Sequence, residues 1–158
     1  TSDRNYTWLY FRELNSTKMN ILILQGPNMN LLGLKSSQNT EKLTLAKLNK
    51  AIRSDLRSKN VNLKILQTHK EFQALNFLQR NRSWAEGLLL IPTSWARNNY
   101  NIYETLKVIS LKTSIIYFSN PFSFGTNEKN SIINGKDIKS FTGNPIETCL
   151  EGLNSLLK

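Results

Sequence analysis

Two asparagines follow a run of apolar residues near the start of the chain. The segment Gly26-Pro27-Asn28-Met29-Asn30 comes directly after the apolar stretch 20–25, and its glycine and proline turn the chain sharply. Asparagine amides at such a turn can donate and accept hydrogen bonds, which suits a polar ligand. A structural loop, in which the asparagines make only local turn hydrogen bonds, explains the pattern equally well.

Side chains that commonly bind metals or act as nucleophiles are scarce. His69 is the single histidine and Cys149 the single cysteine. One of each excludes a histidine-rich metal site, a cluster of cysteine ligands and a disulfide framework. We therefore expect an intracellular, cytoplasmic protein without a bound metal, and we expect His69 to be a surface residue.

The charge balance is strongly basic. Lysine and arginine number 21 against 11 aspartates and glutamates, and the net charge of +10 predicts attraction to anions. The basic residues are scattered, without a stripe of interleaved arginines and aromatics, so a solvated surface also explains them. A small-molecule or anionic ligand stays open, whereas nucleic acid is not expected as a partner.

Strand and helix patterns alternate along the chain, and these elements must position the polar residues. Strand patterns cover 20–25, 61–67, 87–91, 114–118 and 138–142, and helical spacing covers 44–59, 71–82, 99–110 and 145–157. This alternation predicts a single α/β domain with a flavodoxin-like, doubly wound parallel sheet of five strands. Ligands bind at the carboxyl ends of the strands in such folds.

The domain is expected to span 19–158, after an N-terminal extension, 1–18, that we expect to be flexible. The extension lacks the apolar core of a secretory signal, although an organelle stroma is an alternative location if it belongs to a targeting segment. The longest apolar runs, Ile21–Leu24 and Gly87–Ile91, are far shorter than the roughly 20 residues that cross a membrane. No membrane association is expected.

The polar loop also resembles a known signature. Read as GPNxNxLG, Gly26–Gly33 resembles the signature of type II 3-dehydroquinate dehydratases. The resemblance runs without gaps from Met19 to about Ser131 and includes Thr44-Leu45, Gly87, Pro92 and Ser119-Asn120. It implies a cofactor-free lyase of the shikimate pathway, which converts 3-dehydroquinate to 3-dehydroshikimate and water. It also implies a homo-oligomer, because the family assembles as dodecamers built from trimers.

The residues that transfer protons in the family are replaced in this chain. The family uses a tyrosine base of lowered pKa, favoured by an arginine, and this chain has Thr40 and Lys35 at those positions. An alcohol titrates far above neutral pH, so Thr40 cannot abstract the proton by itself. Tyr117 replaces the histidine that protonates the leaving hydroxyl, and Ile115 replaces its supporting glutamate.

Most of the substrate-binding positions differ too. Ile91-Pro92-Thr93 stands where the family has an Asn-Pro-Gly turn, so Ile91 replaces a substrate-binding asparagine. Arg97 replaces a histidine, and Glu128 replaces the arginine that binds the substrate carboxylate, where like charges would repel. Asn28 is retained, as is the turn of Ser119 and Asn120, whose backbone binds the carboxylate in the family.

These replacements together predict a catalytically impaired or inactive pseudoenzyme, because the residues of a catalytic set act as a unit. In one alternative, Tyr117 acts as acid or base in a remodelled pocket because Lys35 or Arg97 lowers its pKa. In another, the chain is a non-catalytic oligomeric scaffold or regulatory subunit. In a third, it is a basic protein that binds anions or nucleic acid.

Overall fold

Five parallel strands form one sheet at the centre of the computed structural model, which describes residues 18–37 and 42–158. Across the sheet they lie in the order β2 (Val61–Gln67), β1 (Met19–Gln25), β3 (Gly87–Ile91), β4 (Thr113–Phe118) and β5 (Ile138–Gly143). All four neighbouring pairs are parallel. This strand order is that of flavodoxin-like doubly wound sheets, as the alternating patterns predict.

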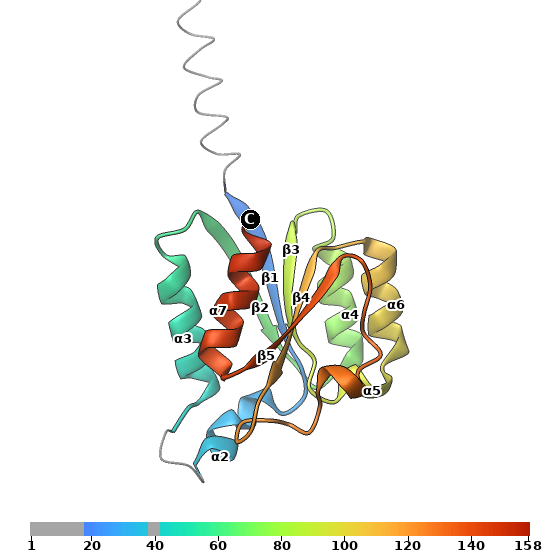
Figure 1. Cartoon of the computed structure of the whole chain (residues 1–158). Coiled ribbons are helices and arrows are strands. Elements are labelled where there is room, and N and C mark those ends of the chain that lie inside the picture. The colour runs from blue at the N-terminus through green and yellow to red at the C-terminus, as the bar shows by residue number, and fades with distance from the viewer. Residues whose placement is uncertain (1–17, 38–41) are drawn as a thin grey trace, which may run out of the picture.

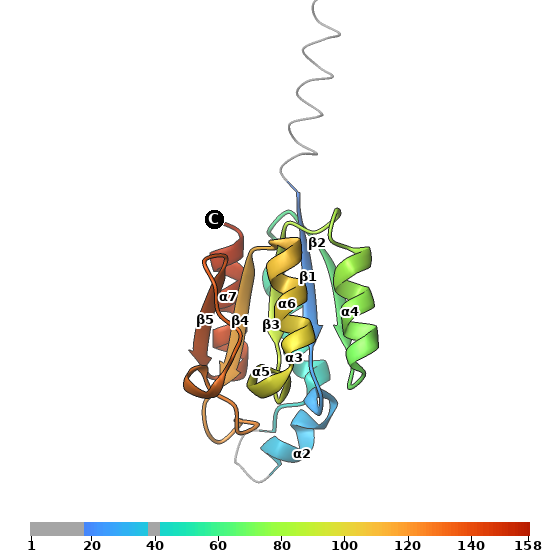
Figure 2. The ribbon, with the colours of Figure 1, turned by 90° about the vertical axis from the view of Figure 1, so that its right-hand side faces the viewer.

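Helices cover both faces of the sheet (Figure 1). α3 (Leu45–Leu56) and α7 (Pro145–Leu156) pack on one face, and α4 (Glu71–Arg80) and α6 (Tyr100–Ile109) pack on the other. In Figure 2, α4 and α6 lie in front of the sheet and α7 lies behind it. Because the strands are parallel, their carboxyl ends meet at one edge of the sheet, at the bottom of Figure 1, and their amino ends at the opposite edge.

Local sequence sets where the helices start. The Thr44 hydroxyl accepts a hydrogen bond from the Lys47 N–H at 3.2 Å and caps the start of α3. The Asn99 side chain accepts from the Ile102 N–H at 3.0 Å and caps α6 in the same way. Pro145 begins α7, at a position where a helix needs no N–H donor.

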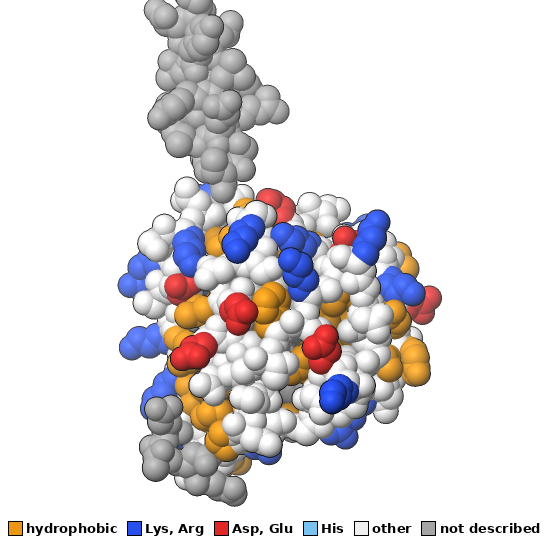
Figure 3. Space-filling view, viewed as in Figure 1, with side chains coloured by type: hydrophobic (Ala, Val, Ile, Leu, Met, Phe, Trp, Pro, Cys, Tyr) orange, Lys and Arg blue, Asp and Glu red, His pale blue; other side chains and the backbone are white. Residues whose placement is uncertain are grey.

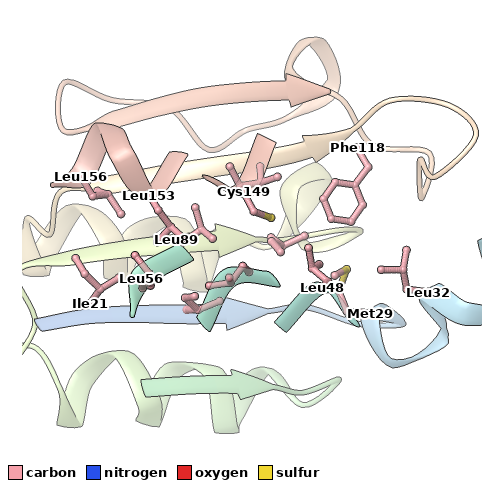
Figure 4. Close-up of a cluster of buried hydrophobic side chains, with 14 of the residues drawn as sticks. Ile21, Met29, Leu32, Leu48, Leu56, Leu89, Phe118, Cys149, Leu153 and Leu156 are labelled. Atoms are coloured by element: carbon pink, nitrogen blue, oxygen red, sulfur yellow. The ribbon is translucent and has the colours of Figure 1, made fainter. Parts of the chain in front are cut away.

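The core consists of two hydrophobic clusters that the sheet separates. Successive strand residues face opposite sides, so Ile21 and Ile23 pack beneath α3 and α7 while Leu22 and Leu24 pack beneath α4 and α6. Figure 4 shows the first cluster, where strand side chains meet those of α3 and α7. Each fully buried leucine or isoleucine stabilises the fold by about 1.5–3 kcal/mol.

The predicted strands and long helices all form, with ends that differ by at most three residues from the expected ones. Four short elements were not predicted: η1 (Met29–Leu31), α2 (Leu32–Ser36), α5 (Trp95–Asn98) and η2 (Glu128–Asn130). Each is too short to show a helical period in the sequence. Of the predicted extension 1–18, only Lys18 lies within the described residues.

The described residues contain neither a candidate membrane span nor a candidate metal site. None of the helices in 18–37 and 42–158 combines the length and apolar character of a membrane span. In the same residues, no group of three or more His, Cys, Asp or Glu side chains is placed to hold a metal ion.

Candidate ligand site at the carboxyl edge of the sheet

The loop after β1 holds Asn28 at the carboxyl edge in a left-handed conformation, with φ 69° and ψ 2°. Asparagine is one of the few residues besides glycine that adopts this conformation routinely. The Asn28 N–H donates a hydrogen bond to Nδ1 of His69 at 3.2 Å, which ties the loop after β1 to the loop after β2. The Asn28 side chain is exposed and does not cap η1. His69 is exposed as predicted, but its contact with Asn28 was missed.

A second contact joins the loops after β1 and β3. The Gly26 N–H donates to the Ile91 carbonyl oxygen at 2.8 Å, and a Cβ at position 26 would lie 2.5 Å from the Pro92 carbonyl oxygen. Thr93 strengthens the contact because its hydroxyl donates to the Pro27 carbonyl oxygen at 2.8 Å. Thr93 is buried with φ 48°, a strained conformation for a β-branched residue. The sequence holds one indication of this strain: Thr93 stands where the resemblance implies the glycine of an Asn-Pro-Gly turn.

The segment that carries the family's base and arginine is only partly described. Lys35 is exposed on α2, and its Nζ lies 5.8 Å from the centre of the Phe124 ring, within cation–π range. Thr40 lies outside the described residues. Lys35 therefore contacts an aromatic ring from the connection between β4 and β5.

Two of the positions where the resemblance implies polar residues lie in the core. Ile91, at the end of β3, is 2% exposed and belongs to the cluster beneath α3 and α7. Ile115, in β4, is 0% exposed and belongs to the cluster beneath α4 and α6. Both side chains are apolar, so neither can hydrogen-bond to a ligand, and they lie on opposite faces of the sheet.

Tyr117, at the position of the general acid, is buried in β4. Its hydroxyl has no hydrogen-bond partner among the described residues. Burial raises the pKa of Tyr117 above its ordinary value of 10.0, because the phenolate loses its hydration. The Ser131 hydroxyl lowers the pKa, the charge of Glu128 raises it further, and the Ser140 hydroxyl lowers it. The two serines are near but not placed for a hydrogen bond.

The alternative in which Lys35 or Arg97 lowers the pKa of Tyr117 is wrong. The pKa moves in the other direction, and the charge that acts on Tyr117 is the negative one of Glu128. Arg97 is exposed and donates through Nη2 to the Gly125 carbonyl oxygen. Arg97 thus holds the connection between β4 and β5.

The end of β4 places the turn that the resemblance implies for carboxylate binding. The Ser119 N–H donates to the Gly143 carbonyl oxygen at 2.9 Å, so this donor is already used at the end of the sheet. Asn120 is exposed. Glu128 is exposed in η2 and adds a negative charge to this part of the surface. An anionic substrate would find less positive charge here than the resemblance implies.

Five cavities formed by described residues have volumes between about 200 and 560 Å³. One of about 520 Å³ lies beside the start of α7 and is lined mainly by Leu43, Phe122, Pro145 and Ile146. None of the five is lined by Asn28, Lys35, Arg97 or Tyr117. These four predicted site residues thus do not converge on any of these cavities.

Comparison with known proteins extends over nearly the whole chain. The family described as Dehydroquinase class II matches residues 19–157. The chain belongs to the class II dehydroquinase family. A 3-dehydroquinate dehydratase of Clostridium acetobutylicum is 28% identical over 102 residues, which are 65% of this chain and 71% of that protein. One from Prochlorococcus marinus subsp. pastoris is 26% identical over 140 residues, 89% of this chain and 96% of that protein.

Solved structures related to class II dehydroquinases share the fold. The type II dehydroquinase from Butyrivibrio crossotus matches with a TM-score of 0.77 at 20% identity, over 90% of this chain and 99% of that chain. A 3-dehydroquinate dehydratase-like protein from Bifidobacterium longum matches with a TM-score of 0.58 at 13% identity, over 88% of this chain and 95% of that chain. The predicted family and fold class are both confirmed.

Proposed function

We propose that this member of the class II dehydroquinase family is a pseudoenzyme. It keeps the fold but does not dehydrate 3-dehydroquinate by the proton transfers of the family. One observation carries the proposal: Ile91, Ile115 and Tyr117, which stand at positions that should handle substrate and protons, are 2%, 0% and 3% exposed. Side chains packed in this way cannot contact a substrate at the edge of the sheet.

The pKa of Tyr117 also argues against proton transfer. An acid or base works best when its pKa lies near the working pH. Burial moves the pKa of Tyr117 away from neutrality, so at neutral pH its phenol is neither an effective base nor an effective acid. The two cations that could have activated Tyr117 interact elsewhere. Lys35 lies against the Phe124 ring, and Arg97 donates to the Gly125 carbonyl oxygen.

The remaining role that we propose is a non-catalytic subunit of a homo-oligomer, as a scaffold or regulator. Support comes from the outer surface of α4 and α6, where Phe72, Tyr100 and Val108 are 69%, 66% and 77% exposed. Large apolar side chains exposed on two neighbouring helices can take part in a protein contact. The molecular mass in solution, measured by light scattering at low and high salt, tests this role. A monomer at both salt concentrations would contradict it.

A second candidate is a weak or altered form of the family reaction. The exposed Asn28 side chain favours this candidate. Asn28 is the asparagine that the family motif has at this position, and it lies at the carboxyl edge of the sheet. The substrate would have to be held by few polar groups. We therefore expect poor binding as well as slow turnover in this case.

An activity assay separates the two candidates. The purified chain is incubated at high concentration with 3-dehydroquinate, and the enone absorbance of the product is followed. The proposal predicts no turnover above the reaction without protein. Turnover that is abolished by Asn28→Ala and unchanged by Asn60→Ala would overturn the proposal. Asn60 is the matched control, because both asparagines are exposed but only Asn28 lies in the loop after β1. Turnover that survives Asn28→Ala comes from a contaminant and leaves the proposal standing.

A further inference from the structure

Three lysines line a small cavity at the amino-terminal edge of the sheet, opposite the edge that holds Asn28. The cavity has a volume of about 200 Å³, and Lys112, Lys136 and Lys139 line it together with Asp137 and Ser155. Figure 3 shows lysine and arginine side chains gathered along the upper rim of the molecule, at this end of the sheet. The three lysines against one aspartate leave a net charge of +2 around the cavity.

The pairing of β4 with β5 brings these lysines together. Thr113 pairs with Ile138 and Ser114 with Lys139, so Lys112, just before β4, lies beside the residues that begin β5. The Thr113 N–H donates to the Asp137 carbonyl oxygen at 2.9 Å and fixes this register. The hydrogen-bonded backbone therefore fixes where Lys112 and Lys139 leave the sheet.

Helix capping explains only one of the three lysines. The Lys112 Nζ donates to the Ser155 carbonyl oxygen at 3.2 Å, in the last turn of α7, where a cation is favoured. Lys136 and Lys139 are exposed, and neither forms a side-chain hydrogen bond or ion pair with another described residue. Asp137 likewise forms no ion pair within the described residues. Two lysines thus line the cavity without a hydrogen-bond or ion-pair partner among the described residues.

We propose that this cavity binds the phosphoryl group of a small phosphorylated molecule. A lysine ammonium is a compact charge with three donors and binds phosphate oxygens through strong, charge-assisted hydrogen bonds. Ser155 also lines the cavity, and a serine hydroxyl is a neutral group that can donate to a phosphate oxygen. The lining contains no aromatic side chain on which a base could stack, which favours a small phosphate compound over single-stranded nucleic acid.

Binding of defined phosphate compounds tests the proposal with the full chain. Inorganic phosphate, glycerol 3-phosphate, malonate and a short single-stranded oligonucleotide are titrated separately, and amide shifts and calorimetry report binding. The variant Lys136→Gln/Lys139→Gln removes the two unpartnered charges. The control Lys50→Gln/Arg53→Gln removes the same charge from the exposed surface of α3, away from the cavity. Thermal unfolding of both variants checks that they fold.

The expected result is that glycerol 3-phosphate binds more tightly than malonate, with shifts centred on residues 135–139. The cavity variant should weaken this binding by at least about tenfold, because two charge-assisted hydrogen bonds are lost, while the control changes it by less than about twofold. Inorganic phosphate should compete with glycerol 3-phosphate if the phosphoryl group alone is recognised. Equal weakening in both variants, equal binding of malonate, or preferential binding of the oligonucleotide would each overturn the proposal.

Discussion

The Thr93 hydroxyl lies 2.8 Å from the Pro27 carbonyl oxygen and donates a hydrogen bond to it, so the loop after β3 holds the loop after β1. Thr93 does this with φ 48°. The conformation costs about 1–3 kcal/mol for a residue other than glycine. The hydrogen bond and the burial of the side chain offset this strain.

Two substitutions of Thr93 separate these contributions. Thr93→Val keeps the strain and loses the hydrogen bond, so we expect the free energy of unfolding to fall by about 1–2 kcal/mol. Thr93→Gly loses the same bond but removes the strain, so it should be more stable than Thr93→Val. Denaturant unfolding gives both values. Thr105→Val on α6, half-buried, is the control and should change stability by less than about 0.5 kcal/mol.

Gly26 is predicted to tolerate no side chain. In Gly26→Ala the new Cβ would lie 2.5 Å from the Pro92 carbonyl oxygen, and the two loops would have to separate. We expect a loss of at least about 2 kcal/mol in the free energy of unfolding, together with shifted amide signals for Asn28 and Thr93. Gly135→Ala is a matched control, since its Cβ would make an ordinary 3.7 Å contact with Ile138. Similar losses in both variants would show that the close contact at Gly26 is absent.

Tyr117→Phe is expected to stabilise the protein by about 1 kcal/mol at neutral pH, because the buried hydroxyl has no partner among the described residues. Tyr117 also affects alkaline stability. In the folded state Tyr117 keeps its proton above pH 10.0, where the tyrosine of the unfolded chain loses it. The free energy of unfolding is therefore unaffected by this group below pH 10.0 and declines as the pH rises further. Unfolding measured across this range should decline less steeply in Tyr117→Phe. A large loss at neutral pH would show that the hydroxyl is hydrogen-bonded.

Cys149 provides a second alkaline effect and a chemical test of the core. Burial raises the pKa of this thiol from 9.0 to about 12, so stability should fall between those pH values by about 1.4 kcal/mol for each pKa unit. Cys149→Ala should flatten this part of the pH profile.

The Cys149 thiol should also react with a thiol reagent only after unfolding. Cys149→Ala/Ser58→Cys, with an exposed cysteine in its place, should react at once and so controls for the reagent.

The long helices are predictable because each buries a periodic apolar face, as Leu48, Ile52 and Leu56 do in α3. The central strands are predictable because they are short apolar runs that are buried on both faces, as in β3. The site is less predictable. Motif spacing correctly places Asn28 and Asn120 at the carboxyl edge as exposed groups. It does not reveal the direction of the Tyr117 pKa shift or the bond from Thr93 to Pro27, since both depend on contacts between residues far apart in the chain.

Ile91 and Ile115 lie in separate clusters on opposite faces of the sheet, so each closes a different half of the core. A polar residue at either position would place an unpaired group in a packed apolar layer, at a cost of about 1–3 kcal/mol. The two costs would arise independently, because the sheet separates the two layers. A polar ligand site that reached both positions would therefore lower the stability of both halves of the core at once.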